Sequence, residues 1–307
     1  MRITTSMVQR SILADLNTLS VKLARTQTKA ASGREITRPA DNPFGTSKAM
    51  GLRSNLAAND QYMRNIDDAR GWMDATESAL DSITQFVKRA QDLVVQASTD
   101  TADATSRSAV AAEIAQIIQG VKETANSSYG DRYIMSGTET SVPPYKLGDD
   151  DTYQGNDAGH DPALAGIVRE IGPGVTMTIN SVASELLGSG RSDPGDGKLL
   201  NVLRDIADHL AADDGAALRS GDLSALKQQL DGVLEVRARN GSMSNRLDAA
   251  STRMDQIGLA LTDQLSKTED ADFAQTMIDF NSQSAAYQAA LRAGATIIQS
   301  SLMDFLR

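Results

Sequence analysis

The sequence contains no cysteine, few aromatic residues and no long apolar run. Without cysteine the chain has no disulfide, no thiolate nucleophile and no zinc–cysteine or iron–sulfur site. Aromatic residues make up 4% of the 307 residues, which is low for a compact enzyme with a large central core. Because no stretch of about 18 apolar residues occurs, we expect no segment that spans a membrane.

The charge balance excludes a further class of function. The 40 acidic residues outnumber the 30 lysines and arginines, which gives a formal net charge of −10. A protein that binds duplex nucleic acid needs a basic surface to displace phosphate counterions, so we expect no nucleic-acid partner. The first residues, MRITTSMVQRSILADL, contain no uninterrupted apolar stretch and no small-residue cleavage site, so we expect no cleaved Sec signal peptide.

Motifs for metal or phosphate binding are also missing. The two histidines, His160 and His209, lie far apart, and the sequence HExxH is absent. An EF-hand loop beginning at Asp149 needs a glutamate where His160 stands. The segment SDPGDGKLL has Ser192 at the first glycine position of a phosphate loop and Leu199 in place of serine or threonine. We therefore predict no enzyme, no cofactor and no metal, and we interpret the acidic run that begins at Asp149 as a solvated loop.

Long amphipathic helices dominate what the sequence does contain. In residues 5–32, apolar or small residues recur at steps of three and four, which marks one face of a helix. The stretch 32–45, with two prolines and two glycines, ends this helix, and a second helix extends from there to about residue 96. The apolar stripe of the second helix repeats every seven residues and includes Ile66, Met73, Leu80 and Val87.

Further helices are predicted around residues 110–124 and 199–210, and one long helix from 222 through 261. The glycine of RNGSMSN is a weak point in that long helix, because glycine costs about 1 kcal/mol relative to alanine there. Between these helices, residues 138–198 are rich in glycine, proline and aspartate and lack helical periodicity. Within this segment GIVREI and GVTMTIN are predicted strands, so we expect a small β-rich insertion. The preceding segment DRYIMSGTE is predicted to be a strand that leads into a turn.

The C-terminal segment has the most regular pattern. From residue 273 to residue 305 its apolar and small positions alternate at steps of four and three without a slip. Chain ends are normally polar and frayed, so an apolar stripe this close to the end implies that something covers it. The side chains that we expect at such an assembly interface are Ile12, Leu16, Leu19, Leu23, Phe273, Met277, Phe280, Tyr287, Leu291, Ile298, Leu302 and Phe305.

These patterns predict a mainly α fold in which the N- and C-terminal helices form a coiled-coil terminal layer. We expect this assembly domain to comprise residues 1–42 and 265–307, and a helical-bundle inner domain to comprise residues 43–137 and 199–264. Residues 138–198 would form the inserted, β-rich, variable outer domain. An ordinary intramolecular bundle explains the stripes of the inner helices, whereas the stripe at the C-terminus favours contacts between subunits.

Charge at the two ends supports their pairing. Residues 1–40 carry seven lysines and arginines against two acidic residues, whereas residues 263–307 carry six acidic residues against three basic ones. Opposite charges beside a coiled-coil seam select partner and orientation. Antiparallel pairing is predicted to bring together Lys22, Arg25 and Lys29 with Asp270, Asp272 and Asp279. The alternatives are two solvated faces, or a basic N-terminus that serves export.

Three segments carry a resemblance to a known family. LARTQTKAASGREITRPADNPFG resembles the flagellin-type sequence between the first and second helices, and ARNGSMSNRLDAA resembles the start of the C-terminal inner helix. SAAYQAALRAGATIIQSSLMDFLR is similar to the final amphipathic helix of the family. The chain thus resembles the flagellin superfamily of bacterial axial proteins over its whole length. MRITTSMV, RPADNPFG and YIMSGTETSVPPY look like the hook–filament junction branch, and the NSAKDDAAG-like break of filament flagellins is not found.

The resemblance implies a secreted structural protein of the flagellum that contributes to motility. It implies export in an unfolded state by flagellar type III secretion, with a chaperone bound to the C-terminal helix. The implied partners are other copies in a ring, the hook protein, the other hook-associated junction protein and flagellin. Two alternatives stay open at this point, namely a filament flagellin and a coiled-coil scaffold or secreted effector.

Overall fold

A computed structural model describes residues 5–99, 103–159, 165–193 and 196–305, with side-chain burial in the last helix described to Ala295. The elements in chain order are α1 (Thr5–Ser32), α2 (Pro43–Ala97), α3 (Ala104–Ala125), β1 (Ser128–Tyr129), β2 (Arg132–Tyr133), β3 (Val168–Gly172), β4 (Val175–Thr178), α4 (Ala183–Leu187), η2 (Gly190–Ser192), α5 (Leu199–Ala211), α6 (Gly215–Ala217), η3 (Leu218–Asp222), α7 (Leu223–Glu269) and α8 (Phe273–Phe305). The predicted mainly helical fold is confirmed. None of the helices searched in these residues is long and apolar enough to cross a lipid bilayer.

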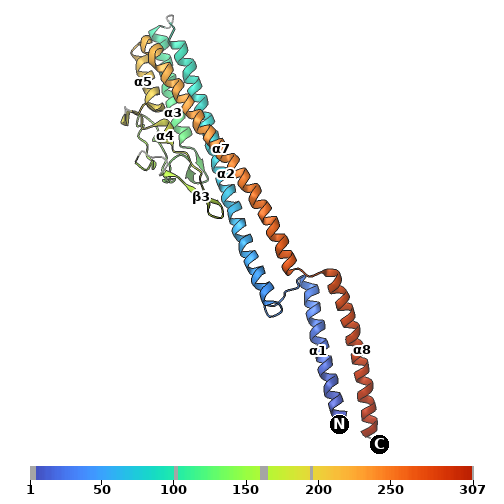
Figure 1. Ribbon diagram of the computed structural model, residues 1–307. Helices are drawn as coiled ribbons and strands as arrows, with labels where there is room; N and C mark the ends of the chain where they lie inside the picture. Colours follow the sequence, from blue (N-terminus) through green and yellow to red (C-terminus); the bar gives the residue numbers. More distant parts are fainter. Residues whose placement is uncertain (1–4, 100–102, 160–164, 194–195, 306–307) are drawn as a thin grey trace. The chain divides into compact units, whose positions relative to one another are not determined.

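The chain divides into two compact units. The first, which we call the terminal unit, comprises residues 1–58 and 256–307, and the second, which we call the central unit, comprises residues 59–255. The long helices α2 and α7 each contribute residues to both units (Figure 1). The segment 138–198 lies in the central unit together with the inner helices.

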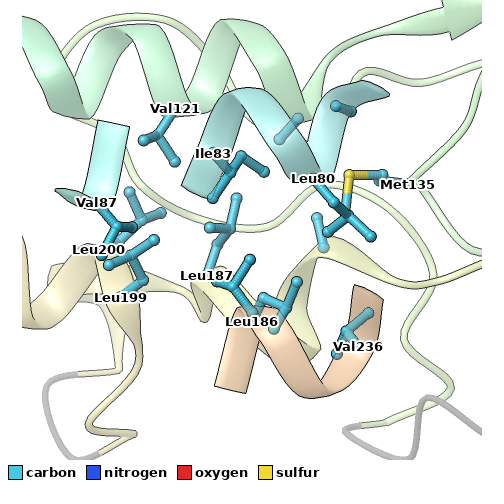
Figure 2. Packing of buried hydrophobic residues seen from close by; sticks show 14 of the residues in the cluster. Leu80, Ile83, Val87, Val121, Met135, Leu186, Leu187, Leu199, Leu200 and Val236 are labelled. Atoms are coloured by element: carbon cyan, nitrogen blue, oxygen red, sulfur yellow. The ribbon is translucent and has the colours of Figure 1, made fainter. Parts of the chain in front are cut away.

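The apolar core lies in the central unit. The heptad stripe of α2 is fully buried, as its pattern predicts, and it packs with residues of α3, α4, α5 and α7 in one cluster (Figure 2). Full burial of a leucine or isoleucine contributes about 1.5–3 kcal/mol, so this cluster is the main source of stability. Residues of the cluster with no exposure include Ile66, Leu80, Ile83, Val87, Ile114, Val121, Leu187, Leu199 and Leu200.

The helix boundaries follow local chemistry. The Asn42 side chain accepts a hydrogen bond from the Gly45 N–H at 2.9 Å and so satisfies one of the free donors at the start of α2. Asp103 does the same for α3, by accepting from the Ser106 N–H at 2.8 Å. The expected weak point in α7 is not a break, and the helix continues through it. Its Asn240 is buried and donates to the Met73 carbonyl at 3.2 Å, so contacts with α2 offset the cost of the neighbouring glycine.

The strands predicted within and just before the segment 138–198 are present, and the one before it is shorter than expected. GIVREI and GVTMTIN do form the antiparallel pair β3–β4, but the strand predicted in DRYIMSGTE is limited to Arg132–Tyr133, which pairs with β1. Ile171, Met177 and Leu187 of this segment belong to the same buried cluster as the helices. The described part of the segment is therefore largely loop, and it is anchored by apolar side chains on the helices.

Candidate assembly interface

In the terminal unit, α1 and α8 lie side by side and antiparallel, so the first and last helices form a hairpin (Figure 1). The Thr26 hydroxyl donates a hydrogen bond to Oε1 of Gln283 at 2.8 Å, and Thr26 is buried. Near the other end, a Cβ on Gly294 would lie 3.4 Å from Cγ2 of Ile12, so glycine allows a close approach of the two helices. The sequence prediction that the two ends pair is thus realised within a single chain.

The hairpin buries its apolar stripe only in part. The predicted side chains Ile12, Leu16, Leu19 and Leu23 on α1, and Met277, Phe280 and Tyr287 on α8, are half-buried. Two further predicted residues are exposed, Phe273 by 65% and Leu291 by 45%. The side chains of the remaining three, Ile298, Leu302 and Phe305, lie outside the described residues. A pair of helices is therefore too small to cover the stripe, and its residues are available to a further partner.

The half-buried stripe also borders a hollow of about 360 Å³ between the two helices. Its lining is mostly aliphatic and includes Ile12, Leu16, Leu19, Ala290, Ala293 and Gly294. Small residues on α8 face branched residues on α1, which leaves room for side chains from another helix. Three of the four predicted interface residues of α1 therefore line one hollow.

The terminal unit as a whole has almost no apolar core. Among its described residues only Ala49 and Leu52 are buried apolar side chains. Large apolar residues that are exposed in this unit are Met7, Leu13, Val21, Phe44, Met50, Ile257, Leu259, Phe273, Ile278 and Leu291. Exposed apolar surface on this scale marks a site of protein association. The terminal unit is therefore the candidate surface for association with other chains.

A cluster of charges joins the connector after α1 to the end of α7. Glu269 is buried, and its Oε1 atom binds Nε of Arg34 at 2.8 Å and a guanidinium nitrogen of Arg53 at 2.5 Å. Two backbone hydrogen bonds run alongside, from the Glu35 N–H to the Glu269 carbonyl at 2.7 Å and from the Ala271 N–H to the Gly33 carbonyl at 2.9 Å. Gly33 has a φ of +68°, which glycine adopts without strain.

This cluster replaces the charge pairing that was predicted from the sequence. No ion pair in the described part of the chain joins the set Lys22, Arg25 and Lys29 to the set Asp270, Asp272 and Asp279. Lys29 does line a recess together with Asp272 and Asp279, so the antiparallel juxtaposition is right. None of the predicted pairs is formed in the described part of the chain, and Lys29, Asp270, Asp272 and Asp279 each have a nearer partner.

Four of these six side chains have local partners. Lys29 forms an ion pair with Glu35. Asp272 accepts a hydrogen bond from the Gln275 N–H at 3.1 Å, as expected for the residue that caps a helix. Asp279 accepts from Nε2 of Gln275 at 3.0 Å, and Asp270 accepts from the Ser266 hydroxyl at 2.5 Å. Lys22 and Arg25 are exposed on α1.

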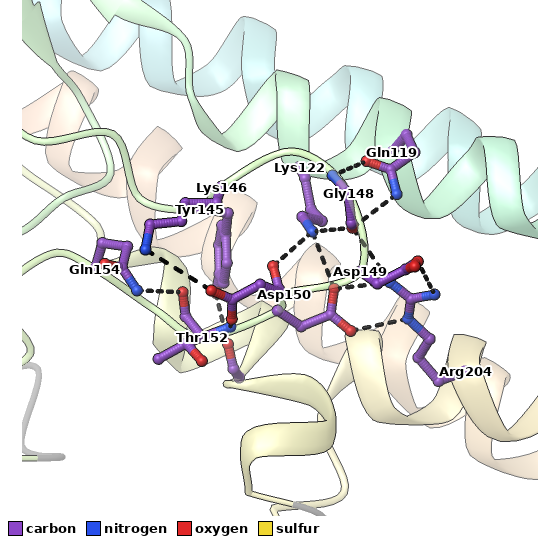
Figure 3. A network of polar contacts seen from close by, with 12 residues as sticks. Gln119, Lys122, Tyr145, Lys146, Gly148, Asp149, Asp150, Thr152, Gln154 and Arg204 are labelled. Atoms are coloured by element: carbon purple, nitrogen blue, oxygen red, sulfur yellow. Dashed lines mark hydrogen bonds and ion pairs between the residues drawn. The ribbon is translucent and has the colours of Figure 1, made fainter.

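The acidic run at 149–151 is only partly a solvated loop. Asp149 is fully exposed, but Asp151 is fully buried and bound to the buried ammonium of Lys122 at 3.0 Å. The same ammonium donates to the carbonyls of Gly148 and Asp150, each at 2.8 Å (Figure 3). A lysine side chain from α3 thus occupies the centre of the loop. Interpreting the whole run as solvated was wrong because Asp151 has a buried cationic partner far away in the sequence.

Arg204 of α5 completes this network. It donates to both carboxylate oxygens of Asp151, at 2.8 and 3.0 Å (Figure 3). The hydrogen bond and charge of that carboxylate raise the pKa of Arg204 above its ordinary value, against a smaller opposing effect of burial. The arrangement satisfies both sides of a buried charge pair and so fixes the loop to α3 and α5.

Of the two histidines, His209 lies in the described part of the chain. His209 binds Asp222 through Nδ1 at 2.8 Å, and this hydrogen bond raises its pKa. His160 lies outside the described residues. Among the residues that could be searched, no group of three or more histidine, cysteine or carboxylate side chains is arranged to hold a metal ion.

Arg34, Arg53, Glu269 and Lys122 were missed by sequence reasoning. For Lys122 a signal was present, because it follows Val121 in a helix whose other buried positions after Arg107 are aliphatic. A lysine there requires a buried acceptor. For Glu269 no comparable signal exists, since its two arginine partners lie more than 200 residues earlier in the chain.

Comparison with known proteins gives two family matches. Residues 3–140 match the bacterial flagellin N-terminal helical region, and residues 223–306 match the bacterial flagellin C-terminal helical region. Together these regions include α1, α2 and α3 at one end and α7 and α8 at the other. The unmatched part between them contains the β3–β4 pair and α5.

Individual relatives align over nearly the whole chain. Flagellar hook-associated protein 3 of Escherichia coli is 24% identical over 303 residues, which cover 95% of this chain and 96% of that protein. A flagellin of Bacillus subtilis is 24% identical over 321 residues and covers all of both chains. The crystal structure of Bacillus cereus FlgL superimposes with a TM-score of 0.58 at 25% identity, over 70% of this chain and 99% of that one.

Proposed function

The chain belongs to the bacterial flagellin family, and we propose that it is the structural subunit that joins the hook to the filament of the bacterial flagellum. It has no chemical step to perform. Its function is mechanical, because subunits packed in a ring at the distal end of the hook adapt the hook lattice to that of the filament. The protein acts through the packing of helices.

The observation that carries this proposal is the incomplete apolar surface of the terminal unit. In a chain of this family, the α1–α8 hairpin with half-buried Leu16, Leu19 and Phe280 is suited to pack with other hairpins around a common axis. The full-length similarity to a flagellar hook-associated protein 3 supports the junction rather than the shaft of the filament. The interface residues predicted from the sequence are proposed to make these contacts between subunits.

We further propose a division of labour along the chain. Residues 1–42 and 265–307 would form the terminal assembly domain, residues 43–137 and 199–264 the inner domain, and residues 138–198 the outward-facing variable domain. The terminal helices would line the axial channel, and the inner helices would make lateral contacts. The proposed partners are the hook protein, the other hook-associated junction protein and flagellin.

Export sets a separate requirement on the terminal helices. The proposed route is type III secretion of the unfolded chain, with a chaperone that covers the apolar stripe of α8 before assembly. An exposed apolar stripe would associate prematurely. When the helix becomes ordered during assembly, burial of the stripe offsets the entropy cost of that ordering. The basic N-terminal segment, with Lys22, Arg25 and Lys29 unbound to the last helix, is available to serve export.

Immunogold electron microscopy of intact cells tests the proposed location. An antibody against residues 140–195 should label one discrete band where hook meets filament. Label along the whole filament would instead identify a filament flagellin, a function favoured by the full-length similarity to the Bacillus subtilis flagellin. Absence of label from every flagellar structure would overturn both assignments.

A further inference from the structure

Two rows of charged residues with the same spacing lie on different helices of the central unit. The acidic row is Asp60, Asp67 and Asp74, which follow one another at intervals of seven along α2. The basic row is Arg246 and Arg253, which have the same interval on α7. Seven residues are close to two helical turns, so each row lies along one face of its helix. All five residues are exposed.

These charged side chains form few ion pairs within the described part of the chain. No ion pair in the described residues involves Asp60, Asp74, Arg246 or Arg253. Asp67 has one long contact, 3.5 Å from a nitrogen of Arg70 on its own helix. The surroundings reinforce each sign, because residues 59–85 carry six acidic and two basic residues, whereas residues 237–256 carry four basic and two acidic ones.

The acidic row, on α2, lies beside one side of α7, whereas the basic row lies on the opposite side of α7, so one chain cannot pair them with each other. Asp81 continues the acidic row and binds Arg237 at 3.0 Å. Arg239 continues the basic row and binds Glu185 of α4 at 2.5 Å. Arg237 and Arg239 are two positions apart and therefore point about 200° apart around the helix. The acidic row of α2 thus lies beside the side of α7 that binds α2. The basic row lies on the other side of α7 and points away from α2.

We propose that the acidic row of one copy binds the basic row of a second copy, so that central units associate side by side. Contact between two different surfaces repeats from copy to copy and closes into a ring when the rotation allows. This inference rests on the proposed function, for which it names the lateral contact. Opposite charges in matched rows select the partner surface and its register, while apolar burial in the terminal unit supplies affinity.

The register of the chain's own helices fits this contact. The ion pairs Arg70–Asp248 at 2.6 Å and Arg237–Glu77 at 2.7 Å fix the relative height of α2 and α7. By this register, Arg246 lies at a height between Asp67 and Asp74, and Arg253 at a height between Asp60 and Asp67. For two copies at equal height, each arginine is roughly 5 Å along the axis from two aspartates of its neighbour. An arginine side chain spans that distance, and its five N–H donors can serve both carboxylates.

Charge reversal in full-length protein tests the contact. One variant carries Asp60→Lys, Asp67→Lys and Asp74→Lys, a second carries Arg246→Glu and Arg253→Glu, and a third combines all five changes. Each is expressed in flagellated cells that lack their own copy, and incorporation into flagella is measured by quantitative blotting. Either row reversed alone places like charges opposite each other and should reduce incorporation about tenfold. The combined variant restores opposite charges and should recover most of that loss.

A control variant, unfolding curves and a cross-linking experiment accompany the charge reversals. Asp92→Lys with Lys227→Glu changes exposed charges on the same two helices outside the rows and should leave incorporation unchanged. Unfolding curves of the purified variants identify any that fail to fold. Because the chain has no cysteine, Asp67→Cys with Arg246→Cys in one chain allows a short thiol cross-linker to report the contact directly. A ladder of cross-linked oligomers from isolated flagella is expected.

Three outcomes would overturn the inference: full incorporation of both single-row variants, no recovery by the combined variant, or no cross-linked ladder. The proposed function has a separate test. The immunogold experiment shows where the protein is located, and its result does not depend on whether the charge rows form the lateral contact. If the band is present and all three charge variants are incorporated to the same extent, the lateral contact is elsewhere on the central unit. If the band is absent, the proposed function itself fails.

Discussion

The ammonium of Lys122 lies 3.0 Å from Oδ1 of Asp151, and neither side chain is exposed to solvent. We predict that Lys122→Met lowers the free energy of unfolding by about 3–5 kcal/mol, because it leaves a buried carboxylate with Arg204 as its remaining cationic partner. Urea unfolding followed by circular dichroism measures this change.

Lys146 provides a matched control for this prediction. It lies in the same loop, 63% exposed, and its nitrogen is 3.9 Å from a carboxylate oxygen of Asp150. Lys146→Met should therefore change the free energy of unfolding by less than about 1 kcal/mol. Equal losses for the two variants would mean that Lys122 does not hold the loop through Asp151.

His209 gives the central unit a pH-dependent contribution to stability. Its hydrogen bond to Asp222 raises its pKa above 6.5, and the charges of Asp222, Asp205 and Asp214 act in the same direction. Because the pKa of His209 is raised in the folded state, protonated His209 contributes its full stabilisation when the pH is below its ordinary pKa. This contribution is lost as the pH rises through the raised value.

We predict that His209→Gln is destabilising at about pH 5.5 and nearly neutral at about pH 9. The effect at low pH should stay below about 1 kcal/mol, because the histidine side chain is 39% exposed. Unfolding free energies of both proteins across this range measure the difference. A constant difference at all pH values would show that the ion pair contributes nothing.

Hydrogen exchange should separate the two units in the free chain. The terminal unit has only two buried apolar side chains in its described part, so its helices have little to hold them closed. Amides of α1 and α8 are expected to exchange at least about tenfold faster than those of α3. Mass spectrometry of peptides from the purified protein gives the rates. Equal protection of α1, α8 and α3 would indicate a hairpin that is stable without partners.

Gly294 tests the close approach of α1 and α8. A methyl group there would lie 3.4 Å from Ile12, so Gly294→Ala should fit and retain motility. Gly294→Leu places a larger side chain against Ile12 and should separate the helices, with a loss of motility in cells that lack their own copy. Spreading on soft agar measures the effect. Equal motility of both variants would show that this contact is unimportant for assembly.

Much of this fold could be predicted from the sequence because heptad stripes are local signals. The stripe of Ile66, Met73 and Leu80 is fully buried or nearly so, and the predicted start and end of α1 agree with the structure. The strands were harder, because β1 and β2 are two residues each and rely on a turn rather than on a pattern. Strand-like composition near Tyr133 therefore overestimated the β content.

The interface was predictable as a surface but not as a set of ion pairs. Helical periodicity placed Leu16 and Phe280 on apolar faces, and charge asymmetry indicated that the chain ends associate. Which carboxylate binds which cation depends on distances of a few ångströms and on local competitors such as helix caps. Asp272 was predicted to lie beside the basic residues of the first helix, yet its carboxylate accepts a hydrogen bond from the free Gln275 N–H at the start of α8. Glu269, which precedes the predicted acidic residues in the sequence, forms the ion pairs with Arg34 and Arg53.

Pairing of α1 with α8 also makes assembly depend on complete synthesis. A chain that ends before Phe273 keeps the whole central unit, 59–255, and with it nearly all of the buried apolar residues. Such a product has what it needs to fold, but its first helix has no companion. A chain that lacks α8 cannot form the α1–α8 hairpin, so incorporation should require translation through the last helix.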